Sequence, residues 1–360
     1  MDINYLLEKI QCYLNDKGFT IKKSPGLLQP KFNYVFAPSG GHHVIDEIVI
    51  GKTEPHLPIL KFQVAPTDRS IRMYDYDTVG ISSRHLSFFE VIVFGYAGAK
   101  EELPKDEATE ILFNLMTEVL ELNKENILIT TLGSVTAEGS VINEDEDQIF
   151  YETWSRLLGE QKVLKTNGRR NLFYSRNIGN PGGTGCEIYY KMTNGEYIEI
   201  GSQVNYKFKF TGGLEKMRNQ AILQGFGLER LLMALQQKNH VCDTYYLEEI
   251  KQVLSDLFTK DVSIFLYKEK LDIIADHIRA ISFIIYDGQE FDGSARAKLL
   301  IKFIKHMHEQ FVYLGIADQE TFVTAIKNMV NVITEIYKER YSISGCKEKI
   351  VAAVKKVIEN

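Results

Sequence analysis

An arginine and a glutamate flank two phenylalanines in a stretch that could bind an anion. The stretch reads ISSRHLSFFEV, from Ile81 to Val91. If it forms a strand, alternation of side chains places Arg84 and Glu90 on one face. A guanidinium can bind a phosphate or carboxylate through two parallel hydrogen bonds, and the glutamate could order that arginine or accept from the amine of a base. A salt-bridged sheet face without a ligand is the alternative.

A second stretch, GFGLERLL, combines glycines with a charged helix start. Its pattern predicts a strand that turns directly into a helix. Gly225 and Gly227 would let the backbone approach a ligand closely, and a helix start presents N–H groups to an anion. Arg230 would add positive charge in the first turn. The stretch is not a Walker A loop, because GK[ST] is absent, and a glycine-containing turn into a core helix is the alternative.

Together, the two stretches resemble motifs 2 and 3 of class II aminoacyl-tRNA synthetases. Within that class, four segments resemble alanyl-tRNA synthetases in order and spacing. TVGISSRHLSFFEV resembles N-V-G-x-[ST]-x-R-H-x-[ST]-F-F-E-M, and GFGLERLL resembles G-M-G-L-E-R-[LI]. NPGGTGCEIYY is similar to G-P-C-G-P-C-[ST]-E-I-x-Y, and IADHIRAISFIIYDG is similar to A-D-H-x-R-[SA]-x-[SA]-F-L-I-x-D-G. The resemblance covers nearly the whole chain.

The resemblance implies a set of catalytic and ATP-binding residues. Arg84 would hold the α-phosphate of ATP and the substrate carboxylate, and Arg230 would contact the ATP tail and stack near adenine. Both are catalytic candidates, because adenylation develops charge on the α-phosphoryl group as pyrophosphate leaves. The other ATP-binding residues that the resemblance implies are Glu90, Gly225, Gly227 and Glu229.

The resemblance also implies a metal site and a substrate pocket. Glu187 and Glu199 match acids near the nucleotide and are candidate Mg²⁺ ligands, with exposed strand carboxylates as the alternative. Tyr174 stands where the family has a tryptophan on the pocket wall, and Ser202 replaces an asparagine beside the substrate. Leu223 replaces the aspartate that pairs with the α-ammonium of alanine. The residues that would bind ATP therefore match the family pattern, whereas those that would bind the amino acid differ from it.

We therefore expect a ligase that uses ATP, with Mg²⁺, to activate a small amino acid or a related carboxylate. The product would be an adenylate whose acyl group passes to tRNA or to a substitute acceptor. Alanine is the substrate that the resemblance implies, and the altered pocket leaves a different acid or a differently held amine open as alternatives. Two alternatives remain open: a free-standing paralog that serves a biosynthetic pathway without tRNA, and a non-catalytic regulatory paralog.

The segment that would contact tRNA is also altered. DGSARAKLLIKFIKH lacks the asparagine and several arginines of the family pattern. Since affinity for a phosphate backbone grows with the number of cationic contacts, we expect weaker tRNA binding than the family pattern would give. The basic residues that remain are equally well explained as a solvated helix face; they are Lys298, Lys302, Lys305, His306 and His308.

Composition and patterning predict the fold class. The net charge of −6 gives no overall attraction to nucleic acid, and four scattered cysteines favour a reduced, cytoplasmic protein. We expect no signal peptide and no membrane span. Short β-like runs followed by helical periodicity predict an α+β fold: an antiparallel class II synthetase-like sheet flanked by helices, and then an all-helical domain.

We place a catalytic, adenylate-forming domain at residues 1–240 and a helical domain that resembles the tRNA-recognition domain at residues 241–360. Residues 177–185, NIGNPGGTG, contain too much Gly and Pro for a regular element. A homodimer is open as an alternative to a monomer, because class II domains often dimerise.

Overall fold

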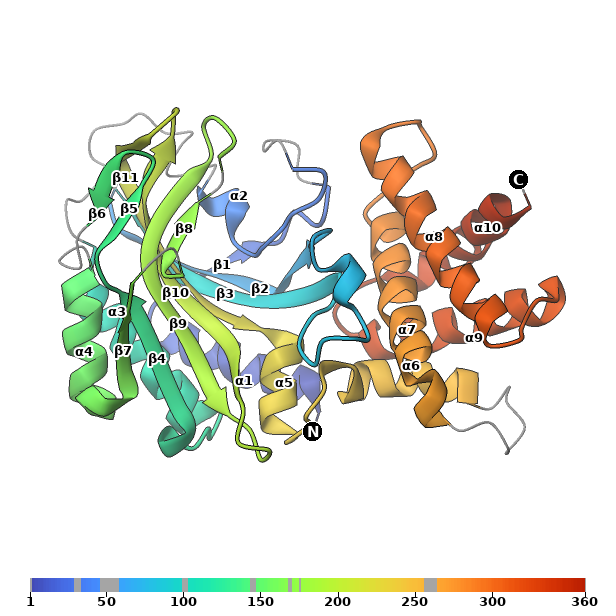
Figure 1. Cartoon of the computed structure of the whole chain (residues 1–360), viewed down its shortest axis with the longest axis horizontal. Helices are drawn as coiled ribbons and strands as arrows, with labels where there is room; N and C mark the ends of the chain where they lie inside the picture. The colour runs from blue at the N-terminus through green and yellow to red at the C-terminus, as the bar shows by residue number, and fades with distance from the viewer. Residues whose placement is uncertain are drawn as a thin grey trace.

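The structure, a computed structural model, describes residues 2–28, 34–45, 58–98, 103–142, 147–167, 170–174, 176–255 and 264–359. In this part of the chain a large twisted sheet lies on one side and a group of helices on the other (Figure 1). The N-terminal helix lies against the sheet, and the chain ends within the helical group. Among the described helices, none is long and apolar enough to cross a membrane.

Nine described strands form the sheet, in the order β1-β2-β3-β11-β10-β9-β4-β7, and β8 also pairs with β9. Their bounds are Thr20–Lys23 (β1), Leu60–Ile71 (β2), Phe88–Gly98 (β3), Ile127–Leu132 (β4), Val163–Thr166 (β7), Leu172–Tyr174 (β8), Pro181–Lys191 (β9), Tyr197–Phe210 (β10) and Leu214–Gly227 (β11). A separate small hairpin joins β5 (Val135–Ala137) and β6 (Ser140–Ile142).

The predicted α+β class is confirmed, with two local differences. The sheet is mixed rather than antiparallel throughout, because β1 and β7 join its edges in parallel. Residues 181–185, which we expected to be irregular, form the start of β9. Gly183 and Gly185 permit this pairing, since a Cβ at either position would lie 2.1 Å from a carbonyl oxygen of β10. The glycines therefore allow close strand approach rather than breaking the strand.

Helices cover one face of the sheet and pack against it to form the core. They are α1 (Ile3–Asp16), α3 (Lys105–Asn114) and α4 (Gln148–Leu158). Trp154 of α4 is fully buried in this core. Its indole N–H donates to Gln203 Oε1 on β10 at 3.1 Å, so the buried polar atom is satisfied. The opposite face of the sheet carries a pocket.

The C-terminal part of the chain is helical. Helix α5 (Leu228–Leu235) follows β11 without a loop, and the remaining helices gather beyond the sheet (Figure 1). They are α6 (Tyr245–Ser255), α7 (Ile264–Tyr286), α8 (Ala295–Tyr313), α9 (Gln319–Tyr337) and α10 (Lys347–Ile358). One cluster of buried apolar residues extends from α1 to α10. The predicted domain boundary at residue 240 falls between α5 and α6 and stays a prediction.

Candidate active site

A pocket of about 350 Å³ opens on the sheet face opposite α1 and α3. Strands β3, β10 and β11 form its floor, and the side chains of Val93, Val204 and Leu223 lie on its face because every second side chain of a strand points the same way. Its walls come from the segment around Gly40, from the turns between β2 and β3, and from the first turn of α5. Residues distant in the sequence therefore meet in one cavity.

Arg84 and Arg230, the two predicted catalytic residues, both line this pocket. Arg230 lies in the first turn of α5, where its Nε donates to the carbonyl oxygen of Arg84 at 3.0 Å. Its Nη1 donates to Glu199 Oε2 at 3.1 Å. Arg84 lies in a turn and not on a strand as we expected, because β3 begins only at Phe88. The structure thus brings the two arginines together through a backbone contact.

A third arginine in the pocket, Arg72, was missed from the sequence. It directly follows the end of β2, and its Nε donates to the carbonyl oxygen of Pro38 at 2.8 Å. Its guanidinium lies 4.7 Å from the centre of the Phe89 ring, within the range of a cation–π contact. The available signal was an arginine at a strand end beside Tyr74 and Asp75, which also line the pocket.

Gly225 and Gly227 lie on the pocket floor, as expected. Gly225 is required by its neighbours in the sheet, since a Cβ there would lie 1.8 Å from the carbonyl oxygen of Ile92. A Cβ at Gly227 would meet no described atom within 4 Å. A side chain is therefore excluded sterically at Gly225, whereas its absence at Gly227 leaves open space at the start of α5.

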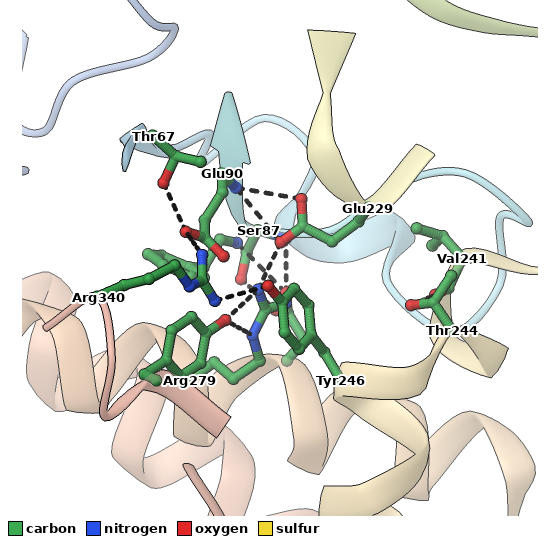
Figure 2. Close-up of polar contacts among 12 residues, drawn as sticks. Thr67, Ser87, Glu90, Glu229, Val241, Thr244, Tyr246, Arg279 and Arg340 are labelled. Atoms are coloured by element: carbon green, nitrogen blue, oxygen red, sulfur yellow. Dashed lines mark hydrogen bonds and ion pairs between the residues drawn. The ribbon is translucent and has the colours of Figure 1, made fainter. Parts of the chain in front are cut away.

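Glu90 does not reach the pocket. Strand alternation directs Phe89 and Val91 to the pocket side, so Glu90 points to the opposite side, where it is fully buried. Its Oε1 accepts from Arg340 Nη1 at 2.6 Å and from the Thr67 hydroxyl at 2.6 Å. Figure 2 shows the Arg340 side chain reaching this carboxylate from the helical part. The expected pairing with Arg84 on one strand face is wrong for this reason.

Glu229 lines the pocket, but its carboxylate is engaged elsewhere. It accepts from the backbone N–H of Glu90 at 3.1 Å and forms a buried ion pair with Arg279 of α7 (Figure 2). Burial raises the pKa of Glu229, and the Arg279 guanidinium opposes that rise. Glu229 therefore joins α5, β3 and α7 directly beside the pocket, and its predicted contact with ATP stays a prediction.

Glu187 and Glu199, the predicted Mg²⁺ ligands, both line the pocket from the neighbouring strands β9 and β10. Glu187 Oε2 accepts from the Tyr189 hydroxyl at 2.6 Å, and burial raises the pKa of its carboxyl group. Mg²⁺ is commonly held by one or two carboxylates together with phosphate oxygens. This pair fits such an ion when a phosphate is also bound, and the ligand role stays a prediction.

Ser202 and Leu223 line the pocket, but Tyr174 is not among the lining residues. The Tyr174 hydroxyl donates to Glu138 Oε1 at 2.6 Å, and the adjacent Phe173 lines the pocket instead. Along a strand, neighbouring residues point to opposite sides, so a displacement of one residue exchanges the two aromatic rings. Phe173 therefore supplies the aromatic wall that we had assigned to Tyr174.

The basic residues expected to face tRNA lie on α8. Lys298, Lys302 and Lys305 are exposed, at a spacing that places them on one side of the helix. Lys302 Nζ lies 4.0 Å from the centre of the Tyr76 ring. His306 is half-buried and is hydrogen-bonded to His277 at 2.9 Å. The exposed positive charge of this helix therefore resides in the three lysines.

Comparison with known proteins assigns the family. The model for tRNA synthetases class II (A) matches residues 13–357. Alanine–tRNA ligase from Flavobacterium psychrophilum is 25% identical over 350 residues, covering 87% of this chain and 38% of that protein. The enzyme of the same name from Caldicellulosiruptor saccharolyticus is 26% identical over 367 residues, covering 95% of this chain and 38% of that protein.

The chain thus spans less than two fifths of the length of these curated relatives. A solved apo histidyl-tRNA synthetase from S. aureus overlays with a TM-score of 0.39 and 12% identity, over 67% of this chain and 68% of that chain. An overlay this distant supports no conclusion. Because the family model matches almost the whole sequence, the chain belongs to the tRNA synthetases of class II (A).

Proposed function

We propose that this chain uses ATP to activate a carboxylic acid as an acyl-adenylate, which is the first half of a ligase reaction. The observation that carries this proposal is the convergence of Arg72, Arg84 and Arg230 in one pocket with a glycine-containing floor. ATP brings several negative charges to its site, and guanidinium groups match phosphate geometry. The family assignment supports the same chemistry.

In the proposed reaction, a carboxylate oxygen of the acid attacks the α-phosphorus of ATP, and pyrophosphate leaves. Negative charge is spread over the phosphoryl oxygens in the transition state. Arg72 and Arg84 would stabilise this charge, and donors that are already in place need no reorganisation during the reaction. Arg230 is oriented in advance by its contacts with Glu199 and with the backbone of Arg84.

Glu187 and Glu199 are the residues that would hold Mg²⁺ against the phosphates. When bound, the ion would neutralise charge on the leaving pyrophosphate. Burial and then the nearby Glu199 carboxylate raise the pKa of Glu187, and a cation held between the two carboxylates would relieve their repulsion. The site residues therefore supply both cations and cation ligands around one cavity.

A small amino acid is the first substrate to test, and tRNA is the first acceptor. Both follow from the names of relatives that this chain matches over only 38% of their length. Lys298, Lys302 and Lys305 would contact an RNA backbone, and so small a set predicts weak binding. We include in the proposal a boundary at residue 240, a cytoplasmic location and a homodimer as the alternative to a monomer.

A paralog that activates an acid without serving tRNA is the second candidate. The observation that favours it is Leu223 at the pocket end, which offers no carboxylate to an ammonium group. A non-catalytic regulatory paralog is the third candidate, and the arginines of the pocket argue against it. The experiment below separates these candidates.

The test is ATP–pyrophosphate exchange with the purified chain, across amino acids and related acids. We expect Arg84→Ala to reduce exchange by at least about 100-fold, as loss of one transition-state donor does. Arg156→Ala is the matched control, because Arg156 is an exposed arginine of α4 that pairs with Glu110. Full exchange by Arg84→Ala would refute the assigned role, and wild-type protein without exchange or ATP binding would favour the regulatory paralog.

A further inference from the structure

One end of the pocket floor is apolar. Leu223 on β11 lies opposite Val204 on β10 and Gly95 on β3. Val93 lies on the same side, and the exposed fractions of Leu223, Val204 and Val93 are only 6%, 3% and 4%. Gly41 covers this end so closely that a Cβ there would lie 3.0 Å from Leu223 Cδ1. A ligand that reaches this end meets aliphatic side chains.

The polar side chains at this end are neutral. Ser202 and Tyr206, both on β10, line the pocket beside Val204. Burial raises the pKa of Tyr206 to about 12, so its phenol stays protonated at neutral pH. Arg72 lines the same pocket, where its guanidinium lies 4.7 Å from the centre of the Phe89 ring. A carboxylate could therefore face Arg72 while its carbon chain rests on the apolar floor.

Each described carboxylate that lines the pocket already lies near a cation or accepts from a donor. These groups are Asp75 in the field of Arg72, Glu187 with Tyr189, Glu199 with Arg230, and Glu229 with Arg279. None of them belongs to the apolar end formed by Leu223, Val204 and Val93. An ammonium group at that end would therefore lack a paired anion among the described residues, which is strongly unfavourable in a buried site.

Asp68 is the remaining carboxylate to consider, because it lies opposite Val91 across β2 and β3. It is fully buried, and it accepts from the Gly41 N–H at 2.8 Å and from the Ser24 hydroxyl at 2.5 Å. His43 Nδ1 lies 3.5 Å away. Asp68 thus anchors the segment that covers the floor and does not line the pocket.

We propose that the acid activated in this pocket carries no ammonium group and is a short aliphatic or 2-hydroxy carboxylic acid. The inference rests on the proposed adenylation. The acid's carboxylate faces Arg72 and Arg84, its carbon chain contacts Leu223 and Val204, and a 2-hydroxyl group can reach Ser202. One carboxylate oxygen forms a bond to the α-phosphorus of ATP, the bond from that phosphorus to pyrophosphate breaks, and no proton is transferred.

The test compares acids that share a carbon skeleton and differ in the ammonium group. Propionic and lactic acids are paired with alanine, and 3-methylbutanoic and 2-hydroxy-3-methylbutanoic acids are paired with valine. Calorimetry measures binding to the chain with a non-hydrolysable ATP analogue, and pyrophosphate exchange measures activation. We expect the neutral member of each pair to be preferred by at least about 100-fold, as a site that leaves a polar group unpaired discriminates strongly.

Preference for alanine or valine over the neutral counterparts in binding would overturn the inference. Binding of none of the acids, neutral or ammonium-bearing, would overturn it as well. Preferential binding of neutral acids without exchange would support the inference and refute the proposed activity, so the two failures are distinguishable.

Leu223→Asp supplies the missing carboxylate, and Leu223→Asn is its isosteric, uncharged control. We expect alanine binding to appear in Leu223→Asp alone, with loss of the preference for propionic acid. Equal alanine binding by both variants would overturn the assignment of Leu223. Thermal unfolding of the two variants shows whether they are folded, and the wild-type acid pairs decide the question if they are not.

Discussion

The buried ion pair between Glu90 and Arg340 can be tested by removing one charge. The pair joins β3 to the segment after α9, and the exposed fractions of the two side chains are 0% and 4%. Glu90 Oε2 has no hydrogen-bond partner among the described residues. In Arg340→Met the buried carboxylate would therefore keep only hydroxyl donors such as Thr67.

We expect Arg340→Met to lower the free energy of unfolding by about 3–5 kcal/mol, as removal of one partner from a buried pair does. The double variant Glu90→Gln/Arg340→Met removes both charges and should recover about 1–3 kcal/mol of that loss. Lys338→Met is the matched control. It breaks the pair with Glu335, in which both side chains are largely exposed, and should change stability little.

Denaturant unfolding followed by tryptophan fluorescence measures these differences. The chain contains one tryptophan, and Trp154 is fully buried in the core of the sheet. A loss below about 1 kcal/mol in Arg340→Met would refute the reasoning, because even an exposed ion pair contributes up to that amount to the free energy of unfolding. A double variant that is less stable than Arg340→Met would also refute it, since removal of both charges leaves neither member of this pair buried without its partner.

Two further predictions concern pH and the sheet. Burial, with a contribution from His277, lowers the pKa of His306 to about 4, so the unfolded chain binds more protons between the ordinary pKa of 6.5 and that value. The stability measured by thermal unfolding should fall as pH drops through this window. The fall should be smaller in His306→Asn, and parallel pH profiles of the wild type and the variant would contradict this. Gly225→Ala places a Cβ 1.8 Å from the carbonyl oxygen of Ile92 and should cost about 3 kcal/mol. Gly213→Ala, with no described atom within 4 Å of the added Cβ, is the control in chemical denaturation, and equal losses would contradict the steric argument.

The candidate site was predictable from the sequence where its chemistry depends on neighbours in the chain. Arg230 and Gly227 lie at one strand–helix junction, which is formed by residues that are adjacent in the sequence. Its glycines and first-turn arginine indicate an anion site through local geometry alone. The α+β class was predictable for a similar reason, because strand and helix periodicities are local patterns.

Which carboxylates and aromatic rings reach the pocket was not predictable in this way. Glu90 was expected beside Arg84, and Tyr174 was expected on the pocket wall. Their neighbours Phe89 and Phe173 line the pocket instead. A difference of one residue reverses the face of a strand side chain, and motif spacing does not state where the strand begins.

The residue types at the strand–helix junction, and the family to which they point, follow from the chain's local sequence alone. By contrast, the place of Arg72 in the pocket and the pairing of Glu90 with Arg340 depend on how the folded chain packs. The latter two residues are 250 positions apart, and no local propensity relates positions so distant. Their contact exists because the helices after residue 240 pack against the sheet and bury both charges together.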